Sequence, residues 1–97
     1  MSPKEKILNT IRQHLKVLNR YGVKKIGLFG SFAQSSQKIT SDIDILVEFK
    51  AGGKTFDNYM DLKFYLEKIF SKKVDLVIKD TLKSRIRNQV LSQVKYA

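Results

Sequence analysis

The chain has 97 residues, of which 42% are hydrophobic, so it can bury one small core. It carries 19 Lys and Arg against 9 Asp and Glu, a formal net charge of +10, and has no cysteine. These features exclude a disulfide framework and a thiolate metal site, and no stretch is apolar over the length of a membrane span. We expect one cytoplasmic domain over residues 1–97. Its charge should attract polyanions such as nucleotides, nucleic acid or an acidic partner, although a solvated lysine-rich surface explains the charge equally well.

The first predicted element is a helix from about Lys4 to Arg20. Ser2 can cap its start and Pro3 suits the first helical position, while Gly22 is a stop signal. His14 lies beside the apolar stripe of this helix, and no nearby residue would form a base–nucleophile pair with it, so we expect a structural role. The apolar positions recur at helical spacing: Ile7, Leu8, Ile11, Leu15 and Leu18.

Three apolar segments are predicted strands. The first, Lys25–Phe29, runs directly into Gly30-Ser31, after which Phe32–Gln34 can form a helical turn. A polar loop from residue 35 to residue 41 leads to the second strand, Asp42–Phe49. The third strand is Val74–Ile78.

Two further helices are predicted after the second and third strands. Thr55 caps a long helix that follows a glycine-containing turn at residues 50–54, and Asp80 or Thr81 caps a last helix. Tyr96 then falls in a frayed terminus. The inner face of the long helix and the apolar positions of the last helix are Phe56, Tyr59, Leu62, Leu66, Ile69, Phe70, Ile86, Val90, Leu91 and Val94.

This order of elements predicts an α/β fold with a small mixed sheet of about three strands flanked by helices. The short connection between the first two strands favours antiparallel pairing, and the helix between the second and third strands permits a parallel crossover. Asp75, near the start of the third strand, would then lie level with Asp42 and Asp44. We therefore expect three carboxylates and the Gly30-Ser31 turn to converge at one edge of the sheet.

The pair Asp42 and Asp44 is the strongest chemical signal in the chain. Residues two apart in a strand point to the same face, and two adjacent carboxylates beside a sheet core are costly unless a cation lies between them. Carboxylate oxygens suit Mg²⁺, and two such ions can clamp an in-line phosphoryl displacement. Gly30 leaves space for a phosphate, and Ser31 adds a hydroxyl. Together these residues point to a nucleoside triphosphate and its metal ions.

Gly30-Ser31, ten residues, and then Asp42-x-Asp44 followed by apolar residues resembles the nucleotidyltransferase signature of the DNA polymerase β superfamily. The small size and the run Gly-Ser-Phe-Ala ahead of Ser-Asp-Ile-Asp-Ile-Leu-Val are similar to the minimal nucleotidyltransferases, the MNT or MntA-type antitoxins. Asp75 falls where that family carries its third carboxylate, so the resemblance covers nearly the whole chain. It implies a polymerase β palm-like core.

The resemblance also implies roles for individual residues. Asp42 and Asp44 would bind two Mg²⁺ ions, Asp75 would complete the site of the metal that activates the acceptor, and Gly30 and Ser31 would hold the β- and γ-phosphates. The reaction would transfer NMP from an NTP, AMP from ATP above all, to a hydroxyl. In this family the partner is commonly a HEPN-domain toxin, an RNase that is silenced when AMP is transferred to one of its tyrosines.

Many family members carry Arg-Gly after Gly-Ser-x-Ala, whereas this chain has Gln34-Ser35 and so lacks one basic side chain that would favour phosphate binding.

Two other functions compete with this interpretation. A catalytically weak or inactive basic module could neutralise a toxin by occlusion or bind nucleic acid, as the net charge allows. Nucleic-acid binding is the less favoured of these because aromatic residues do not clearly interleave with the basic ones. A P-loop at Gly53-Lys54-Thr55 is disfavoured because Glu48 stands where that motif requires its first glycine, so Thr55 is better explained as a helix cap.

Overall fold

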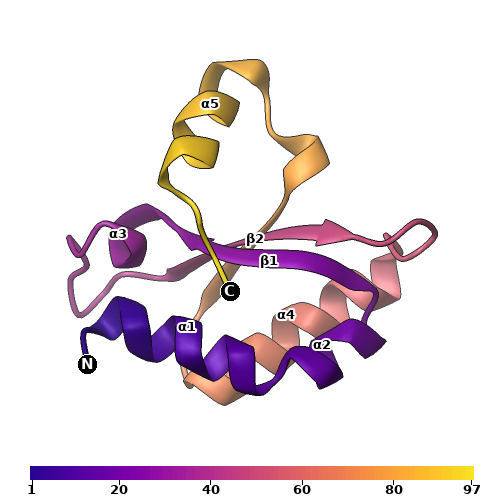
Figure 1. Cartoon of the computed structure of the whole chain (residues 1–97), viewed down its shortest axis with the longest axis horizontal. Coiled ribbons are helices and arrows are strands. Elements are labelled where there is room, and N and C mark those ends of the chain that lie inside the picture. Colours follow the sequence, from indigo (N-terminus) through magenta and orange to yellow (C-terminus); the bar gives the residue numbers. More distant parts are fainter.

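The computed structural model describes all 97 residues and is built around a four-stranded mixed sheet with the strand order β3-β2-β1-β4 (Figure 1). Strand β1 pairs antiparallel with β2 and with β4, whereas β2 and β3 are parallel. Both pairings predicted for the first three strands are therefore confirmed. The strands are β1 (Val23–Phe29), β2 (Ile43–Phe49), β3 (Val74–Ile78) and β4 (Lys95–Tyr96).

The helices are divided unequally between the two faces of this sheet. Helices α1, α2 and α4 cover one face, and α5 alone stands over the other (Figure 1). None of the helices is long and apolar enough to cross a membrane. The helical elements are α1 (Pro3–Gln13), α2 (Leu15–Arg20), α3 (Gly30–Ala33), α4 (Phe56–Phe70), α5 (Ser84–Gln93) and a 3₁₀ turn, η1 (Lys79–Thr81).

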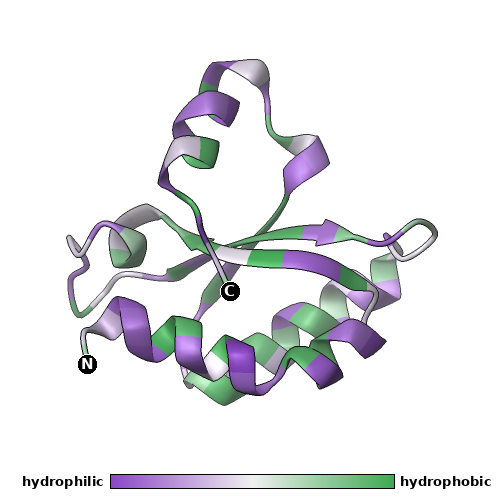
Figure 2. Ribbon diagram, in the orientation of Figure 1, coloured by the Kyte–Doolittle hydropathy of each residue, from purple (hydrophilic) through white to green (hydrophobic).

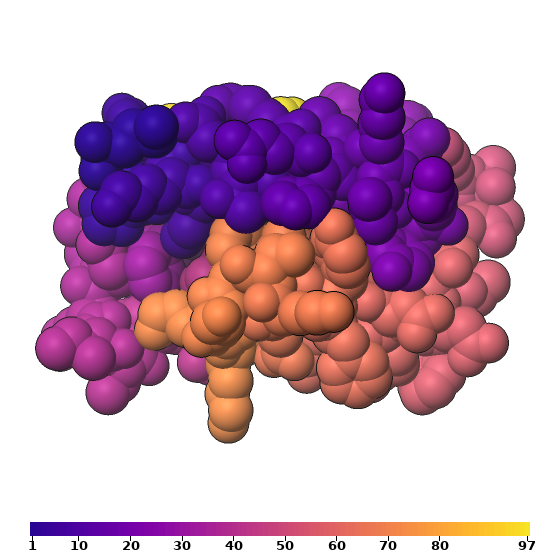
Figure 3. All heavy atoms as spheres, turned by 90° about the horizontal axis from the view of Figure 1, so that it is seen from below, coloured from indigo at the N-terminus to yellow at the C-terminus, as the bar shows by residue number.

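The hydrophobic core lies between the sheet and the helices of the covered face. Figure 2 shows hydrophobic residues along the central strands and on parts of α1 and α4, and Figure 3 shows α1 and α2 beside α4 on the outer side of this layer. Alternate residues of β2, namely Ile43, Ile45 and Val47, belong to the core, so Asp44 and Glu48 fall on the opposite face. The fully buried core side chains include Ile11, Leu18, Leu28, Ile45, Leu62 and Leu66.

The N-terminal helix differs from the sequence prediction because it is broken at His14. The backbone of His14 leaves helical geometry (φ −111°, ψ 11°), so α1 ends and α2 begins there. Its Nδ1 lies 2.7 Å from the carbonyl oxygen of Thr10, and its ring makes an edge contact with Tyr65. These contacts give His14 the structural role expected for it.

The sequence prediction is wrong at two places in the C-terminal region. Neither Asp80 nor Thr81 caps the last helix, since the Thr81 hydroxyl donates to the Ile78 carbonyl at 2.8 Å within the 3₁₀ turn. Helix α5 begins later, with Lys83 at its N-cap and no side-chain cap. Tyr96 is not frayed but forms β4, a fourth strand in place of the expected three, because its backbone pairs with the edge of β1.

Elsewhere the predicted boundaries are close to those of the structure. Strand β1 begins two residues earlier than predicted, at Val23. Gly22 stands at the end of α2 with a left-handed backbone (φ 81°), which is the geometry that favours glycine after a helix. The Thr55 side chain accepts a hydrogen bond from Asn58 N at 3.1 Å, so the prediction that it caps α4, and is not part of a P-loop, is confirmed.

Candidate active site

Two of the three predicted carboxylates are direct neighbours across the parallel strand pair. Asp44 of β2 is in register with Asp75 of β3, and parallel neighbours in register project to the same face of a sheet. Because Ile43 and Ile45 point into the core, both carboxylates lie on the face away from α1, α2 and α4. The two side chains are close enough for the charge of Asp75 to act directly on Asp44. The register of β2 and β3 therefore brings together the two carboxylates at the centre of the candidate site.

Asp42 is exposed, as Asp75 is, whereas Asp44 is half-buried. Asp42 precedes the first residue of β2, and its negative charge acts on Asp44. With the side chains as they stand, no group of three or more acidic or histidine side chains is close enough together to hold a metal ion. The structure thus brings Asp44 and Asp75 into contact and leaves Asp42 beside them at the end of the strand.

The electrostatics of Asp44 follow from this arrangement. Burial, then the charge of Asp75, then the charge of Asp42 raise the pKa of Asp44 from 3.8 to about 6. Each cause disfavours the ionised carboxylate, because a partly desolvated anion faces two others without a nearby cation. A group with this pKa is half protonated at mildly acidic pH, and a cation bound beside it would favour the ionised form.

Gly30 is required by its contact with Asp44. It follows Phe29, which pairs with Asp44 across β1 and β2, and its backbone is left-handed (φ 71°). A Cβ added at Gly30 would collide with Asp44 Oδ2 and lie 3.0 Å from Asp44 Cγ. Any side chain at this position would displace the carboxylate, so the Gly30-Ser31 turn and the acidic pair form one site, as the sequence predicted.

Ser31 lies in the short helix α3, and hydrogen bonds connect the following loop to Ser31 and to Lys72. The carbonyl oxygen of Ser31 accepts a hydrogen bond from Ser36 N at 2.9 Å. Lys72, just before β3, donates from Nζ to the Ile39 carbonyl at 3.1 Å and lies 5.8 Å from the centre of the Phe32 ring. Lys72 therefore links the loop at residues 35–41 to the strand that carries Asp75, a link that sequence analysis did not identify.

Two hydrogen bonds, one to each neighbour of Asp75 in the chain, fix the position of β3. The Glu67 carboxylate accepts from Val74 N at 3.0 Å, and the Tyr59 hydroxyl donates to the Leu76 carbonyl at 2.6 Å. Burial and the charge of Asp75 raise the pKa of Tyr59, which keeps its hydroxyl protonated as a donor. Neither role was predicted, because both contacts join residues that are distant along the chain. Tyr59 also packs against the core, as the helical spacing suggested.

The residues that depart from the family pattern lie immediately after α3. Gln34 is exposed at the C-terminal end of that helix, and Ser35 adopts a left-handed backbone (φ 57°). A Cβ carries a steric cost in this left-handed geometry, so glycine would fit position 35 with less strain than serine. Gln34 is uncharged, so this turn contributes no cation beside Ser31.

Helix α5 is the only helix on the face that carries the carboxylates, and it contacts α3. None of its residues is buried, and Ile86 is 48% exposed. Helix α5 therefore packs only loosely over the face that carries the candidate site.

The chemistry of the donor set fits magnesium. Two neighbouring carboxylates, one of them with a pKa raised by burial and by the charges of the other acids, would be stabilised by a hard divalent cation, and Mg²⁺ prefers such oxygen ligands. Asp42 offers a third carboxylate from an exposed position that leaves its side chain free to turn. Because Gly30 has no side chain, its backbone lies directly against the Asp44 carboxylate.

Comparisons with known proteins agree with this geometry. The family model described as "Nucleotidyltransferase domain" matches residues 8–97. The protein adenylyltransferase MntA of Thermococcus cleftensis is 41% identical over 93 residues, which cover 95% of this chain and 93% of that protein.

Solved structures extend the likeness to the fold. A structure assigned as a minimal nucleotidyltransferase superposes with a TM-score of 0.82 at 32% identity, covering 95% of this chain and 93% of that one. A toxin–antitoxin crystal structure with AMP-PNP superposes with a TM-score of 0.67 at 29% identity, and the match covers 96% of this chain and 70% of that one. A chain from the complex of a tri-AMPylated Shewanella oneidensis HEPN toxin with an MNT antitoxin superposes with a TM-score of 0.65 at 25% identity, and the match covers 93% of this chain and 70% of that one. The chain therefore belongs to the nucleotidyltransferase domain family, in its MntA-type minimal branch, and the enzyme class predicted from the sequence is confirmed.

Proposed function

We propose that this chain transfers AMP from ATP to a hydroxyl group of a partner protein. The observation that carries the proposal is the neighbouring pair Asp44–Asp75 set against the backbone of Gly30, because it places two carboxylates, the ligands that Mg²⁺ prefers, beside the Gly30-Ser31 turn. The name of the Thermococcus relative, a protein adenylyltransferase, supports protein as the acceptor. The neighbouring structure that contains AMP-PNP supports an adenine nucleotide as the donor.

Each site residue has a distinct role in this proposal. Asp42, Asp44 and Asp75 hold Mg²⁺, and Gly30 and Ser31 hold the β- and γ-phosphates of ATP. Bound magnesium would neutralise charge on the triphosphate and lower the pKa of the attacking hydroxyl. Asp44, whose pKa is raised by burial and then by the charges of Asp75 and Asp42, is the ligand that gains most on binding and is the residue that transfer should depend on most.

The transfer itself is a single displacement at the α-phosphorus. The acceptor oxygen forms a bond to that phosphorus, the bond to the bridging oxygen of the leaving group breaks, and the products are pyrophosphate, a released proton and an AMP ester. The chain contributes position and electrostatics, which are the main sources of catalysis in such reactions. Gly30 sets how closely the triphosphate can approach Asp44.

We further propose that the acceptor is a tyrosine of a HEPN toxin, so that transfer silences the toxin. The MNT antitoxin in the Shewanella complex is bound to a HEPN toxin that carries AMP groups, and the likeness to that antitoxin covers 93% of this chain. The open face beneath α5 agrees with an acceptor delivered by a second protein, since this chain does not close over the site by itself.

The test uses pure protein, Mg²⁺ and ATP labelled at the α-phosphate, with and without the product of the neighbouring gene. We expect label on the neighbouring protein, none when the label is in the γ-phosphate, and at least a hundredfold loss in Asp44→Asn. Asp57→Asn is the matched control, because Asp57 is an exposed acid on α4, on the other face of the sheet. Tyrosine modification would be located by mass spectrometry.

Each result assigns the function differently. Label that persists in Asp44→Asn would refute the site. Binding of metal and ATP without label on the neighbour would reject that acceptor. Absence of any binding would favour the alternative, a basic module that neutralises its toxin by occlusion, which the net charge of +10 permits.

A further inference from the structure

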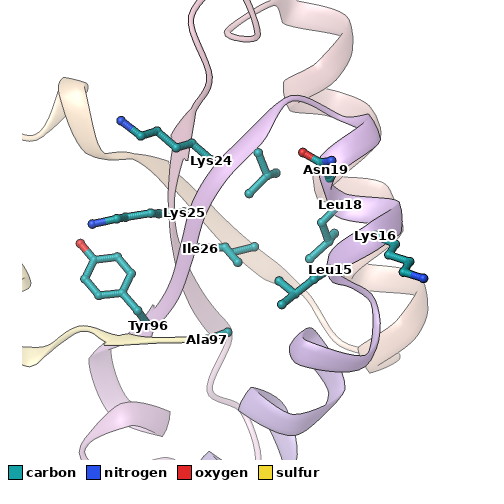
Figure 4. Close-up of a pocket in the computed structure, with 10 residues that line it drawn as sticks. Leu15, Lys16, Leu18, Asn19, Lys24, Lys25, Ile26, Tyr96 and Ala97 are labelled. Atoms are coloured by element: carbon teal, nitrogen blue, oxygen red, sulfur yellow. The ribbon is translucent and has the colours of Figure 1, made fainter.

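A groove of about 500 Å³ lies along the outer edge of β1, between that strand and α2 (Figure 4). Its floor is apolar and is formed by Leu15, Leu18, Val23 and Ile26. Leu15 is 41% exposed even though it is a leucine, because no other segment of the chain covers it. The groove includes none of the residues of the candidate active site.

The rim of the groove is positively charged. Lys16, Lys24 and Lys25 line it, all three are exposed, and no acidic residue is among its lining residues. Figure 4 shows Lys24, Lys25 and Tyr96 on one side of β1 and the leucines of α2 on the other. The Lys25 ammonium lies 5.5 Å from the centre of the Tyr96 ring. The groove therefore has an apolar side and a cationic side, separated by the strand.

The same edge of β1 is only partly paired. Strand β4 is in register with Gly27 and Leu28 alone, and the last hydrogen bond of this pairing runs from Ala97 N to the Ile26 carbonyl at 3.0 Å. Beyond that point Val23–Lys25 pair only with β2, through a shift of register between Val23 and Lys25, and β4 does not extend along them. Exposed strand edges of this kind accept an added strand from another chain.

We propose that this groove binds an extended acidic segment of a partner protein, which adds to β1 in line with β4. Side chains alternate between the two faces of a strand, so alternating apolar and acidic residues would place the former against Leu15 and the latter near Lys24 and Lys25. The charge of the rim selects the acidic residues, and the free strand edge selects an extended backbone. The proposal does not depend on the transferase activity, since the two sites share no residue.

Nucleic acid fits this groove less well than a peptide does. Binding of a single strand relies on aromatic rings that stack with bases, and the one aromatic ring here, that of Tyr96, already lies beside Lys25. An apolar floor next to an unpaired strand edge matches valine side chains and a peptide backbone, whereas a phosphate backbone would use the lysines of the rim and leave the floor without a partner.

The test is an NMR titration of the ¹⁵N-labelled chain with the peptide acetyl-Glu-Val-Glu-Val-Glu-amide. We expect saturable shifts of the amide signals of Val23–Ile26 and Leu15–Asn19, with half-saturation below about 1 mM. The double variant Lys24→Glu/Lys25→Glu should weaken binding at least tenfold. A peptide with serine in place of valine should also bind at least tenfold more weakly. The same loss of affinity is expected for a peptide with N-methylated valines, which cannot donate hydrogen bonds.

Lys68→Glu/Lys73→Glu is the matched control, because it changes the net charge equally at exposed positions on α4 and next to β3, at the other edge of the sheet. This variant should bind the acidic peptide within about twofold of wild type. Leu15→Ser tests the floor at an exposed position and should weaken binding several-fold while the spectrum stays that of a folded protein.

Three outcomes would overturn the proposal. The first is an absence of saturable shifts at 5 mM peptide, and the second is an equal loss in the control variant, which would mean attraction to the net charge alone. The third is that an eight-residue oligothymidylate shifts the same signals when the peptide does not, which would assign the groove to nucleic acid.

Discussion

Replacing Asp44 with asparagine should make the metal-free protein more stable at neutral pH, although it should abolish AMP transfer. Burial and the charges of Asp75 and Asp42 raise the pKa of Asp44 to about 6, so ionisation of this carboxylate opposes folding. The folded state binds the proton more tightly than the unfolded state does. The contribution of Asp44 to wild-type stability is therefore fully present below about pH 4 and is lost as the pH rises through about 6, and asparagine removes this loss.

The shift of about two pH units corresponds to about 3 kcal/mol if Asp44 were fully shielded. Because its side chain keeps some contact with solvent, screening reduces the expected gain to about 1–1.5 kcal/mol above pH 7. For a gain of this reduced size, linkage places about three-fifths of it at pH 4.5 and nearly all of it by pH 7.5.

The assay is urea unfolding of wild type and Asp44→Asn in EDTA at pH 4.5 and pH 7.5. Asp57→Asn serves as the control and should differ from wild type by less than about 0.5 kcal/mol at both values. Magnesium should then stabilise the wild type at pH 7.5 and leave Asp44→Asn almost unchanged, because ligand binding to the folded state raises its stability.

A gain in stability that is the same at both pH values would refute the electrostatic reasoning, since a neutral isostere should differ from aspartate only where aspartate is ionised. A less stable Asp44→Asn at pH 7.5 would show that the carboxylate forms a favourable interaction that outweighs the repulsion.

Three further predictions test the site and the core. Gly30→Ala should lose transfer activity and cost more than about 2 kcal/mol in urea unfolding, because the new Cβ meets Asp44, whereas Gly52→Ala, with φ 77° and no atom within 4 Å, should cost only about 1 kcal/mol of backbone strain. A similar cost for both variants would contradict the proposed contact. Leu62→Ala should cost about 2–5 kcal/mol because Leu62 is fully buried, while Phe64→Ala on the same helix, at a side chain 58% exposed, should stay within about 0.5 kcal/mol by the same measurement. Gln34→Arg should tighten ATP binding about fivefold in calorimetry by adding a cation beside Ser31, and Gln34→Glu should weaken it; equal affinities would place the phosphates elsewhere.

The sequence was sufficient for the parts of the molecule that depend on local pattern. Apolar alternation and helical spacing identified three strands and the long helices, and the connection lengths set the antiparallel and parallel pairings. Glycine at position 22 and threonine at position 55 marked helix ends through their own backbone and side-chain chemistry. Asp42, Asp44 and Asp75 stood out because acids beside apolar strands are expensive unless they have a use.

Features that depend on contacts between distant residues needed the tertiary structure. Strand β4 has two residues and no pattern of its own, and it forms because the edge of β1 supplies its hydrogen bonds. The break at His14 and the late start of α5 likewise reflect packing and local hydrogen bonds that compete with helix continuation.

The candidate site shows the same division. The sequence determined which side chains carry charge and that Asp44 and Asp75 belong to adjacent strands. Only the tertiary structure decided that Gly30 presses against Asp44, that Tyr59 and Glu67 hold the strand beside Asp75, and that the edge of β1 stays open next to three lysines. The physical reason is that periodicity fixes the direction of a side chain within its own element, whereas the distance between two elements depends on how all of them pack.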